Sequence, residues 1–96
     1  MRSYEMMLVF DPHLEEEAID AVLQRLLGII TTAGGEIVKE DKWGKRRLAY
    51  EIDENTEGYY LVINFRSEVA VVDELERVIK ITGEIIRHII VRIEEK

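Results

Sequence analysis

Apolar and polar residues alternate over residues 3–10, the first stretch of the chain with a regular pattern. A period of two is typical of a β-strand, because successive side chains point to opposite faces. One face of the predicted strand carries Tyr4, Met6, Leu8 and Phe10, and the other carries Glu5, Met7 and Val9. Asp11 and Pro12 follow directly and would end the strand.

From Glu15 to Ala33 the apolar residues recur at every third or fourth position, which is the period of an α-helix. The acidic start of this segment suits the positive end of a helix dipole. Gly34 would end the helix in a left-handed conformation. The predicted buried stripe consists of Ile19, Val22, Leu23, Leu26, Leu27 and Ile30.

The middle of the chain predicts two strands joined by a turn. Residues 36–52 alternate only locally around Gly44, which favours a long strand interrupted by a bulge or a flexible arm. Residues 53–58 have the composition of a turn. Tyr59 to Arg66 is rich in aromatic and β-branched residues, so we expect a strand antiparallel to the one before. Its two faces would carry Tyr59, Leu61, Ile63 and Phe65 on one side and Tyr60, Val62 and Asn64 on the other.

A second helix is predicted from Ala70 to Ile81, ended by Gly83. Its buried stripe would consist of Val71, Val72, Leu75, Val78 and Ile79. The last strand, Ile85 to Ile93, carries isoleucine or valine on both faces. The pattern therefore leaves open whether Ile86, His88 and Ile90 or Ile85, Ile89 and Val91 meet the helices. The order βαββαβ predicts an α+β, ferredoxin-like fold, a four-stranded antiparallel sheet with two helices on one face.

The composition limits the chain to one core. It has 96 residues, of which 47% are hydrophobic, so we expect residues 1–96 to form a single domain. Cysteine is absent, which excludes disulfides and thiolate chemistry. No stretch approaches the roughly 20 apolar residues of a membrane span, and no targeting segment is recognised at the start. We expect a cytoplasmic protein.

Catalytic and metal-binding patterns are missing. His13 in a turn and His88 in a strand have neither cysteine partners nor the spacing of metal ligands. Consecutive helical residues such as Glu15 to Glu17 point in different directions and cannot converge on one substrate atom. Residues 53–58 match the start of a calcium loop, but Asn64 stands where the loop needs its last glutamate. We expect no enzyme activity, no metal and no cofactor.

The net charge of −7 disfavours nucleic acid at long range, but the charge is unevenly distributed. Residues 39–50 contain five basic and two acidic residues, a balance of +3, which leaves −10 for the rest of the chain. Residues 42–50 combine four cations with Trp43 and Tyr50. Cations neutralise phosphates and aromatic faces stack on unpaired bases. Composition alone favours equally an RNA-binding segment and a strand edge protected by charge.

Residues 44–52, Gly-Lys-Arg-Arg-Leu-Ala-Tyr-Glu-Ile, resemble the signature of the bacterial small-subunit ribosomal protein six family. That signature is Gly, any residue, a basic residue, a polar residue, Leu, Ala or Ser, Tyr, any residue and Ile. Further matches are Arg2-x-Tyr4-Glu5, Asp11-Pro12, Gly58-Tyr59-Tyr60 and Arg87. The similarity runs in order over essentially the whole chain.

The resemblance implies a ribosomal protein that binds the central domain of small-subunit ribosomal RNA jointly with ribosomal protein eighteen. It implies that Gly44 lets the strand bend, and that Leu48, Tyr50 and Ile52 pack in the strand. The expected RNA contacts are Arg2, Lys42, Trp43, Lys45, Arg46, Arg47 and Arg87. Asp53 departs from the family, which more often has a basic or amide residue there, and this weakens an RNA role for the turn.

An acidic protein with one basic segment needs help to bind RNA, and a basic partner would supply further phosphate contacts. We expect the partner to dock on the sheet face away from the helices, at Met7, Val9, Tyr60 and Val62. The alternative is a small-molecule-sensing regulatory domain on the same scaffold. Such a domain would have a glycine-containing loop after the first strand, where this chain has residues 11–13, Asp-Pro-His.

Overall fold

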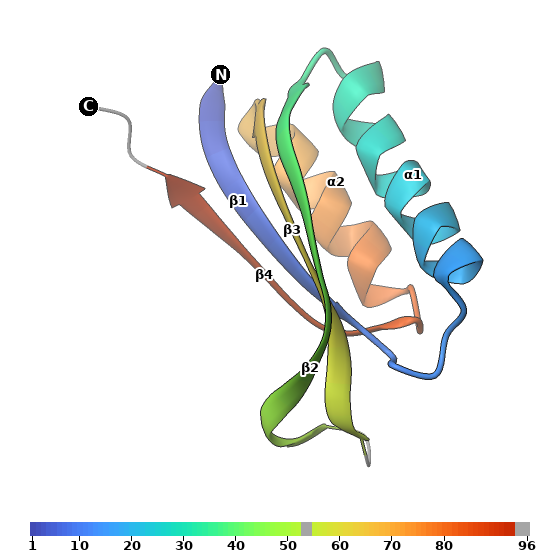
Figure 1. Cartoon of the computed structure of the whole chain (residues 1–96). Coiled ribbons are helices and arrows are strands. Elements are labelled where there is room, and N and C mark those ends of the chain that lie inside the picture. The colour runs from blue at the N-terminus through green and yellow to red at the C-terminus, as the bar shows by residue number, and fades with distance from the viewer. Residues whose placement is uncertain (53–54, 94–96) are drawn as a thin grey trace.

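The computed structural model of the chain describes residues 1–52 and 55–93. Its elements are β1 (Arg2–Phe10), α1 (Glu16–Thr32), β2 (Glu36–Ile52), β3 (Asn55–Ser67), α2 (Val69–Lys80) and β4 (Ile85–Ile93). The strands form one antiparallel sheet in the order β2-β3-β1-β4. Both helices cover the same face of the sheet, and the other face is left open (Figure 1). The predicted fold class is therefore confirmed.

The core lies between the sheet and the two helices. Alternate residues of β1, from Tyr4 to Phe10, point into it, as the two-residue period predicts. They meet Leu61, Ile63 and Phe65 of β3. The helices contribute Ile19, Val22, Leu23, Leu26 and Ile30 from α1 and Val71, Leu75, Val78 and Ile79 from α2. Burial of each large apolar side chain contributes roughly 1.5–3 kcal/mol. Leu27 and Val72, also predicted as core, pack against its margin and are only partly buried.

The two helices end differently. After α1, Gly34 adopts the expected left-handed conformation with φ 85°, and the Gly35 N–H donates to the Ile30 carbonyl at 2.8 Å. After α2, which ends at Lys80 with Ile81 as its cap residue, Gly83 does not adopt the left-handed conformation that Gly34 shows. The Thr82 hydroxyl donates to the Val78 carbonyl at 2.7 Å, which satisfies one of the last acceptors of the helix.

The hairpin of β2 and β3 is longer than predicted. Residues 55–58, which the sequence assigned to a turn, belong to β3 and pair with β2, from Arg46↔Gly58 to Ile52↔Asn55. Positions 53 and 54 of the expected turn, including Asp53, lie outside the described residues. The predicted interruption of β2 is present. Register shifts flank Val38 and Trp43, and Gly44 has φ 79°.

The face of β4 that the sequence left open is settled by its contacts. His88 Nε2 lies 2.8 Å from a carboxylate oxygen of Glu76 in α2, and Ile90 packs against the core, so both face the helices. A register shift between Val9 and Phe10 brings Ile85, from the other set, onto the same face, where it pairs with Phe10 and packs against the core. Ile89, Val91 and Ile93 lie on the open face, with 51%, 43% and 36% of their surface exposed. No helix among residues 1–52 and 55–93 is long and apolar enough to cross a membrane.

Candidate nucleic-acid interface

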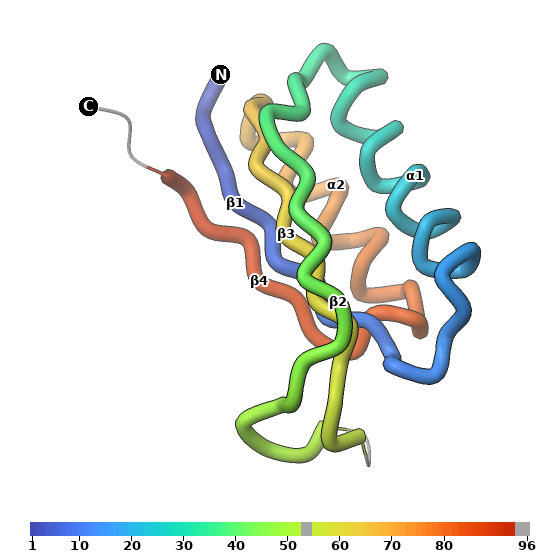
Figure 2. The backbone as a smooth tube through the Cα atoms, in the orientation of Figure 1, coloured from blue at the N-terminus to red at the C-terminus, as the bar shows by residue number. Residues whose placement is uncertain are grey.

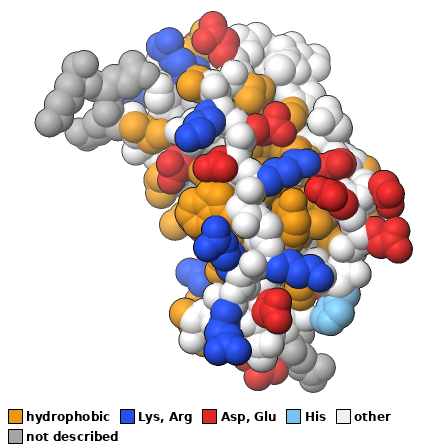
Figure 3. All heavy atoms as spheres, in the orientation of Figure 1, with side chains coloured by type: hydrophobic (Ala, Val, Ile, Leu, Met, Phe, Trp, Pro, Cys, Tyr) orange, Lys and Arg blue, Asp and Glu red, His pale blue; other side chains and the backbone are white. Residues whose placement is uncertain are grey.

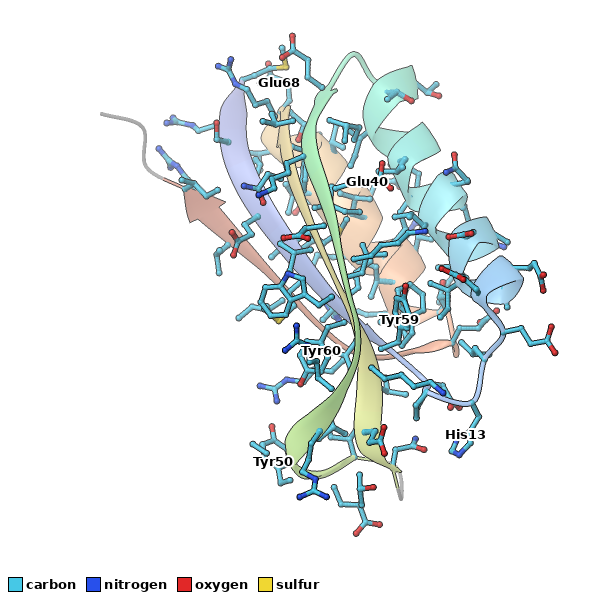
Figure 4. All side chains as sticks on the ribbon, viewed as in Figure 1. His13, Glu40, Tyr50, Tyr59, Tyr60 and Glu68 are labelled. Atoms are coloured by element: carbon cyan, nitrogen blue, oxygen red, sulfur yellow. The ribbon has the colours of Figure 1, made fainter. Side chains whose placement is uncertain are left out.

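Residues 42–50, which we call the basic segment, belong to β2. The pleat of the strand directs their side chains alternately to the two sides of the sheet. Residues paired across an antiparallel ladder share a face. Lys42 pairs with Leu61 and Lys45 with Tyr59, so both cations lie on the side of the helices. Arg46 pairs with Gly58 and lies on the open side. Tyr59 and Tyr60 point to opposite sides of the sheet (Figure 4). The segment that looks continuous in sequence therefore forms two basic surfaces.

On the helix side, Lys42 is held by α1. Its ammonium group lies 2.8 Å from Oδ1 of Asp20. This hydrogen bond raises the pKa of Lys42 above its usual value, and burial opposes the shift. Acidic side chains gather over α1, whereas Lys and Arg follow β2 downward (Figure 3). Lys42 is thus a cation already paired within the chain, which reduces its capacity to neutralise a phosphate.

On the open side, Trp43 and Tyr60 form a stacked aromatic pair. Their ring centroids are 6.2 Å apart and their planes differ by 10°. The guanidinium carbon of Arg46 lies 5.9 Å from the Trp43 ring centroid. The indole N–H donates to a carboxylate oxygen of Asp41 at 3.2 Å, and 42% of Trp43 is exposed. We call Trp43, Tyr60 and Arg46 the aromatic platform.

Beyond Tyr59, which pairs with the last residue of β1, the hairpin continues as a two-stranded ribbon. We call this ribbon, residues 46–52 and 55–58, the arm; it projects past the end of β1 (Figure 2). The Arg87 guanidinium carbon of β4 lies 5.5 Å from the ring centroid of Tyr50 in the arm, and Arg87 Nη1 donates to the Tyr50 hydroxyl at 2.5 Å. The arm is thus connected to the strand at the opposite edge of the sheet.

Close packing brings the arm near β1. A Cβ on Gly58 would lie 2.4 Å from Cγ1 of Val9 and 3.3 Å from Cδ2 of Leu48. Only glycine fits there without displacing its neighbours. Leu48 is buried, with 8% of its surface exposed, as expected for a packing residue. Tyr50 is 59% exposed, so its contact with Arg87 takes place at the surface.

The predicted docking residues lie on the open face but are unequally accessible. Met7, Val9 and Tyr60 line a hollow of about 300 Å³ together with Arg87 and Ile89. Val9 is only 2% exposed, because residues of the arm and the neighbouring strands cover it, and Val62 is only 7% exposed. Met7 and Tyr60 therefore supply most of the accessible surface of the four.

The remaining predicted RNA contacts are spread over the molecule. Arg2 pairs with Ser67 at the far end of β1, about 23 Å from Val9 at a rise of roughly 3.3 Å per residue. Arg47 pairs with Glu57 across the arm, which places an opposite charge directly beside it. The structure thus brings Trp43, Arg46 and Arg87 to the open face, where Arg87 lines the hollow, and places Arg2 far from that group.

A model of the ribosomal protein S6 family matches residues 3–92. The chain belongs to the ribosomal protein S6 family. It is 48% identical over 96 residues to the small ribosomal subunit protein bS6 of Heliobacterium modesticaldum, covering 100% of both chains. It is 46% identical over 96 residues to the protein of the same name from Moorella thermoacetica, covering 100% of this chain and 98% of that one. It is similar in structure to the 30S ribosomal protein S6 of Thermotoga maritima, with a TM-score of 0.88 and 38% identity, over 95% of this chain and 86% of that one.

Membership of the ribosomal protein S6 family confirms the resemblance found in the sequence and the expectation of a non-enzymatic, structural protein. It favours a ribosomal role over the small-molecule-sensing alternative. The residues predicted to contact RNA and the partner are located by the structure, and their roles stay predictions.

Sequence reasoning missed three features of the interface. It did not find Asp20 as the partner of Lys42, nor Gly58 as the point where the arm approaches β1. It assigned Tyr50 to strand packing, and not to Arg87. Each feature depends on contacts between residues far apart in the chain; Tyr50 and Arg87 are 37 positions apart. No local pattern signals such a pair.

Proposed function

We propose that this ribosomal protein of the S6 family binds the central domain of small-subunit ribosomal RNA jointly with ribosomal protein eighteen. The observation that carries the proposal is the aromatic platform, an exposed Trp43 stacked on Tyr60 with the Arg46 guanidinium beside it. Stacked aromatic rings and arginine are the groups with which proteins hold unpaired bases and phosphates. In a chain of net charge −7, their collection on one face supports an RNA contact there.

The cations around the platform supply the phosphate contacts of the proposal. Lys45, Arg46 and Arg47 are exposed and lie at the base and in the first part of the arm. Their two-sided arrangement would let the arm enter a groove or junction of RNA and neutralise phosphates on both walls. The side chains here are cations and aromatic rings, without the amides suited to base edges, so recognition relies on shape and charge.

The partner completes what the chain lacks. Outside residues 39–50 the charge sums to −10, so most of the surface repels RNA, and few phosphates can be neutralised by this chain alone. A basic protein that docks on the open face would add phosphate contacts and neutralise part of this charge. The hollow at Met7 and Tyr60 is an apolar surface on the open face to which such a partner could bind.

The joint-binding proposal is tested by measuring the affinity of the chain for an RNA fragment of the central domain, with and without ribosomal protein eighteen, at one fixed salt concentration. We expect the affinity to rise markedly when the partner is present. Equal affinity in both conditions would overturn the joint mechanism, and absence of binding in both would overturn the RNA contact itself. An RNA hairpin of unrelated sequence serves as the control for charge-driven binding.

A further inference from the structure

The arm lacks the pairing with β1 that supports the rest of the hairpin. Each of its two strands pairs only with the other, since β1 ends opposite Tyr59. An isolated two-stranded ribbon is at best marginally stable in water. The register also shifts between Arg47 and Ile52, so hydrogen bonding within the arm is interrupted. Contacts from outside the ribbon must therefore fix its direction.

Leu48 and Tyr50 of the arm both make contacts with residues outside it, and these contacts lie on the same side of the arm. Near its base, Leu48 is buried, and both Leu48 and Val9 of β1 lie against Gly58. Further along, Tyr50 reaches Arg87 of β4, whose guanidinium carbon lies 5.5 Å from the ring centroid and whose Nη1 donates to the hydroxyl. Because β2 and β4 are opposite edges of the sheet, this second contact spans the sheet beneath the arm. Tyr50 points to the same side of the sheet as Tyr60, away from Tyr59 (Figure 4).

We infer that Arg87 is a positioning residue of the arm: by holding Tyr50, it fixes the direction of the arm before RNA binds. The inference rests on the proposed RNA-binding function for its consequence, but the positioning itself is a property of the free protein. The arm bears Arg46 and Arg47, so its direction determines where two RNA-facing cations lie. A binding element that is already ordered loses less conformational freedom on association.

The chemistry of the contact favours arginine. A guanidinium holds several N–H donors in one rigid plane, so one of them can donate to the Tyr50 hydroxyl while the group stays beside the ring. A lysine at this position would keep the charge but lose the planar group and the fixed fork of donors. Arg87 thus has two roles: its charge attracts phosphate, and its planar group holds Tyr50. Arg87→Lys keeps the first role and removes the second.

The first experiment measures hydrogen exchange of the backbone amides in residues 46–52 of the free protein. Arg87→Lys, Arg87→Ala and Tyr50→Ala should each accelerate this exchange roughly threefold to tenfold, with the core strands unchanged. Arg92→Ala is the matched control, because it removes an arginine from the same strand on the other face. Unchanged exchange in the Arg87→Lys and Tyr50→Ala variants would overturn the inference.

The second experiment measures RNA affinity as a function of salt. Tyr50→Ala, which removes no charge, should weaken binding roughly threefold to tenfold and leave the salt slope unchanged. Arg87→Lys should behave in the same way, and the double variant should be no weaker than either single one. The inference would be overturned if Tyr50→Ala bound RNA like the parent and Arg87→Ala reduced the slope of log affinity against log salt by about one. Arg87 would then be a phosphate contact without a positioning role. If no variant and not even the parent binds RNA, the proposed function fails, while the exchange result still decides the positioning.

Discussion

The indole of Trp43 lies nearly parallel to the phenol ring of Tyr60, across a ladder in which Trp43 itself has no partner. Lys42 faces the helices, so the alternation of the strand already directs Trp43 to the open face, and the bulge leaves both Trp43 and Gly44 opposite Tyr60. The irregular register of β2 then directs Arg46, rather than Lys45, to the same face. The pair gives the acidic chain an exposed aromatic surface next to Arg46.

Trp43→Ala removes the exposed ring of the platform without changing charge. We expect it to weaken RNA binding by about 1–3 kcal/mol, the range for the loss of one base-stacking ring. The salt dependence should stay unchanged, since no phosphate contact is removed. Filter binding at several salt concentrations measures both quantities. Trp43→Phe is the control, and it should recover much of the affinity; equal loss in both variants would count against stacking.

Replacing Lys45, Arg46 and Arg47 together by Ala should change the salt dependence of RNA binding, unlike Trp43→Ala. The slope of log affinity against log salt should become shallower by about 2–3 units, because each of the three lost phosphate contacts changes it by roughly 0.7–0.9. The unfolding midpoint in urea checks that the variant is folded, and it should move little because all three side chains are exposed. An unchanged slope in a folded variant would remove these cations from the proposed interface.

Asp20→Asn releases Lys42 from its ion pair. Both side chains are more than a third exposed, so we expect a loss of stability well below 1 kcal/mol, on the order of 0.2–0.5 kcal/mol. The folded protein raises the pKa of Lys42, so this contribution is fully present below the unfolded pKa of lysine and is lost as the pH rises through the folded pKa. The difference in unfolding free energy between parent and variant should therefore hold from pH 7 to pH 9 and disappear at strongly alkaline pH. The same variant should bind RNA slightly more tightly, because the freed ammonium group can meet a phosphate.

Gly58→Ala tests the close approach of the arm to β1. The new methyl group would lie 2.4 Å from Cγ1 of Val9, so we expect a destabilisation of about 1–3 kcal/mol in urea unfolding. Gly28→Ala in α1 is a matched control, because its added Cβ has no heavy atom within 4 Å. That second change should stabilise the protein by roughly 0.5–1 kcal/mol through helix propensity. A stable Gly58→Ala variant would mean that the arm can lift from β1 without loss.

The regular elements were predictable because their patterns are local. The period of three to four residues identified both helices, and the alternation in β1 placed Tyr4 to Phe10 on the core side. The start of β3 was missed, since three of its first four residues, Asn55, Glu57 and Gly58, are of types depleted in strands. They pair because β2 holds them in the ribbon and the close contact at Gly58 leaves no room for a side chain.

The interface was harder to predict than the fold. The sequence identified the basic segment but treated it as one surface, whereas the pleat separates Lys42 and Lys45 from Arg46. The bulge before Gly44 decides this division, and its exact register is set by packing against β3. The contact between Tyr50 and Arg87 was beyond any local pattern, because it depends on how strongly the hairpin twists.

The position of β4 has a consequence for the protein before it joins the ribosome. Among the described strands, β4 pairs with β1 alone, and its open face displays Ile89, Val91 and Ile93. An edge of this kind is a template on which further extended chains can add, which is the first step of sheet-to-sheet aggregation. The net charge of −7 counteracts it, because copies that carry the same charge repel one another before their edges can meet. The acidity that weakens the attraction to RNA thus also keeps newly made copies apart.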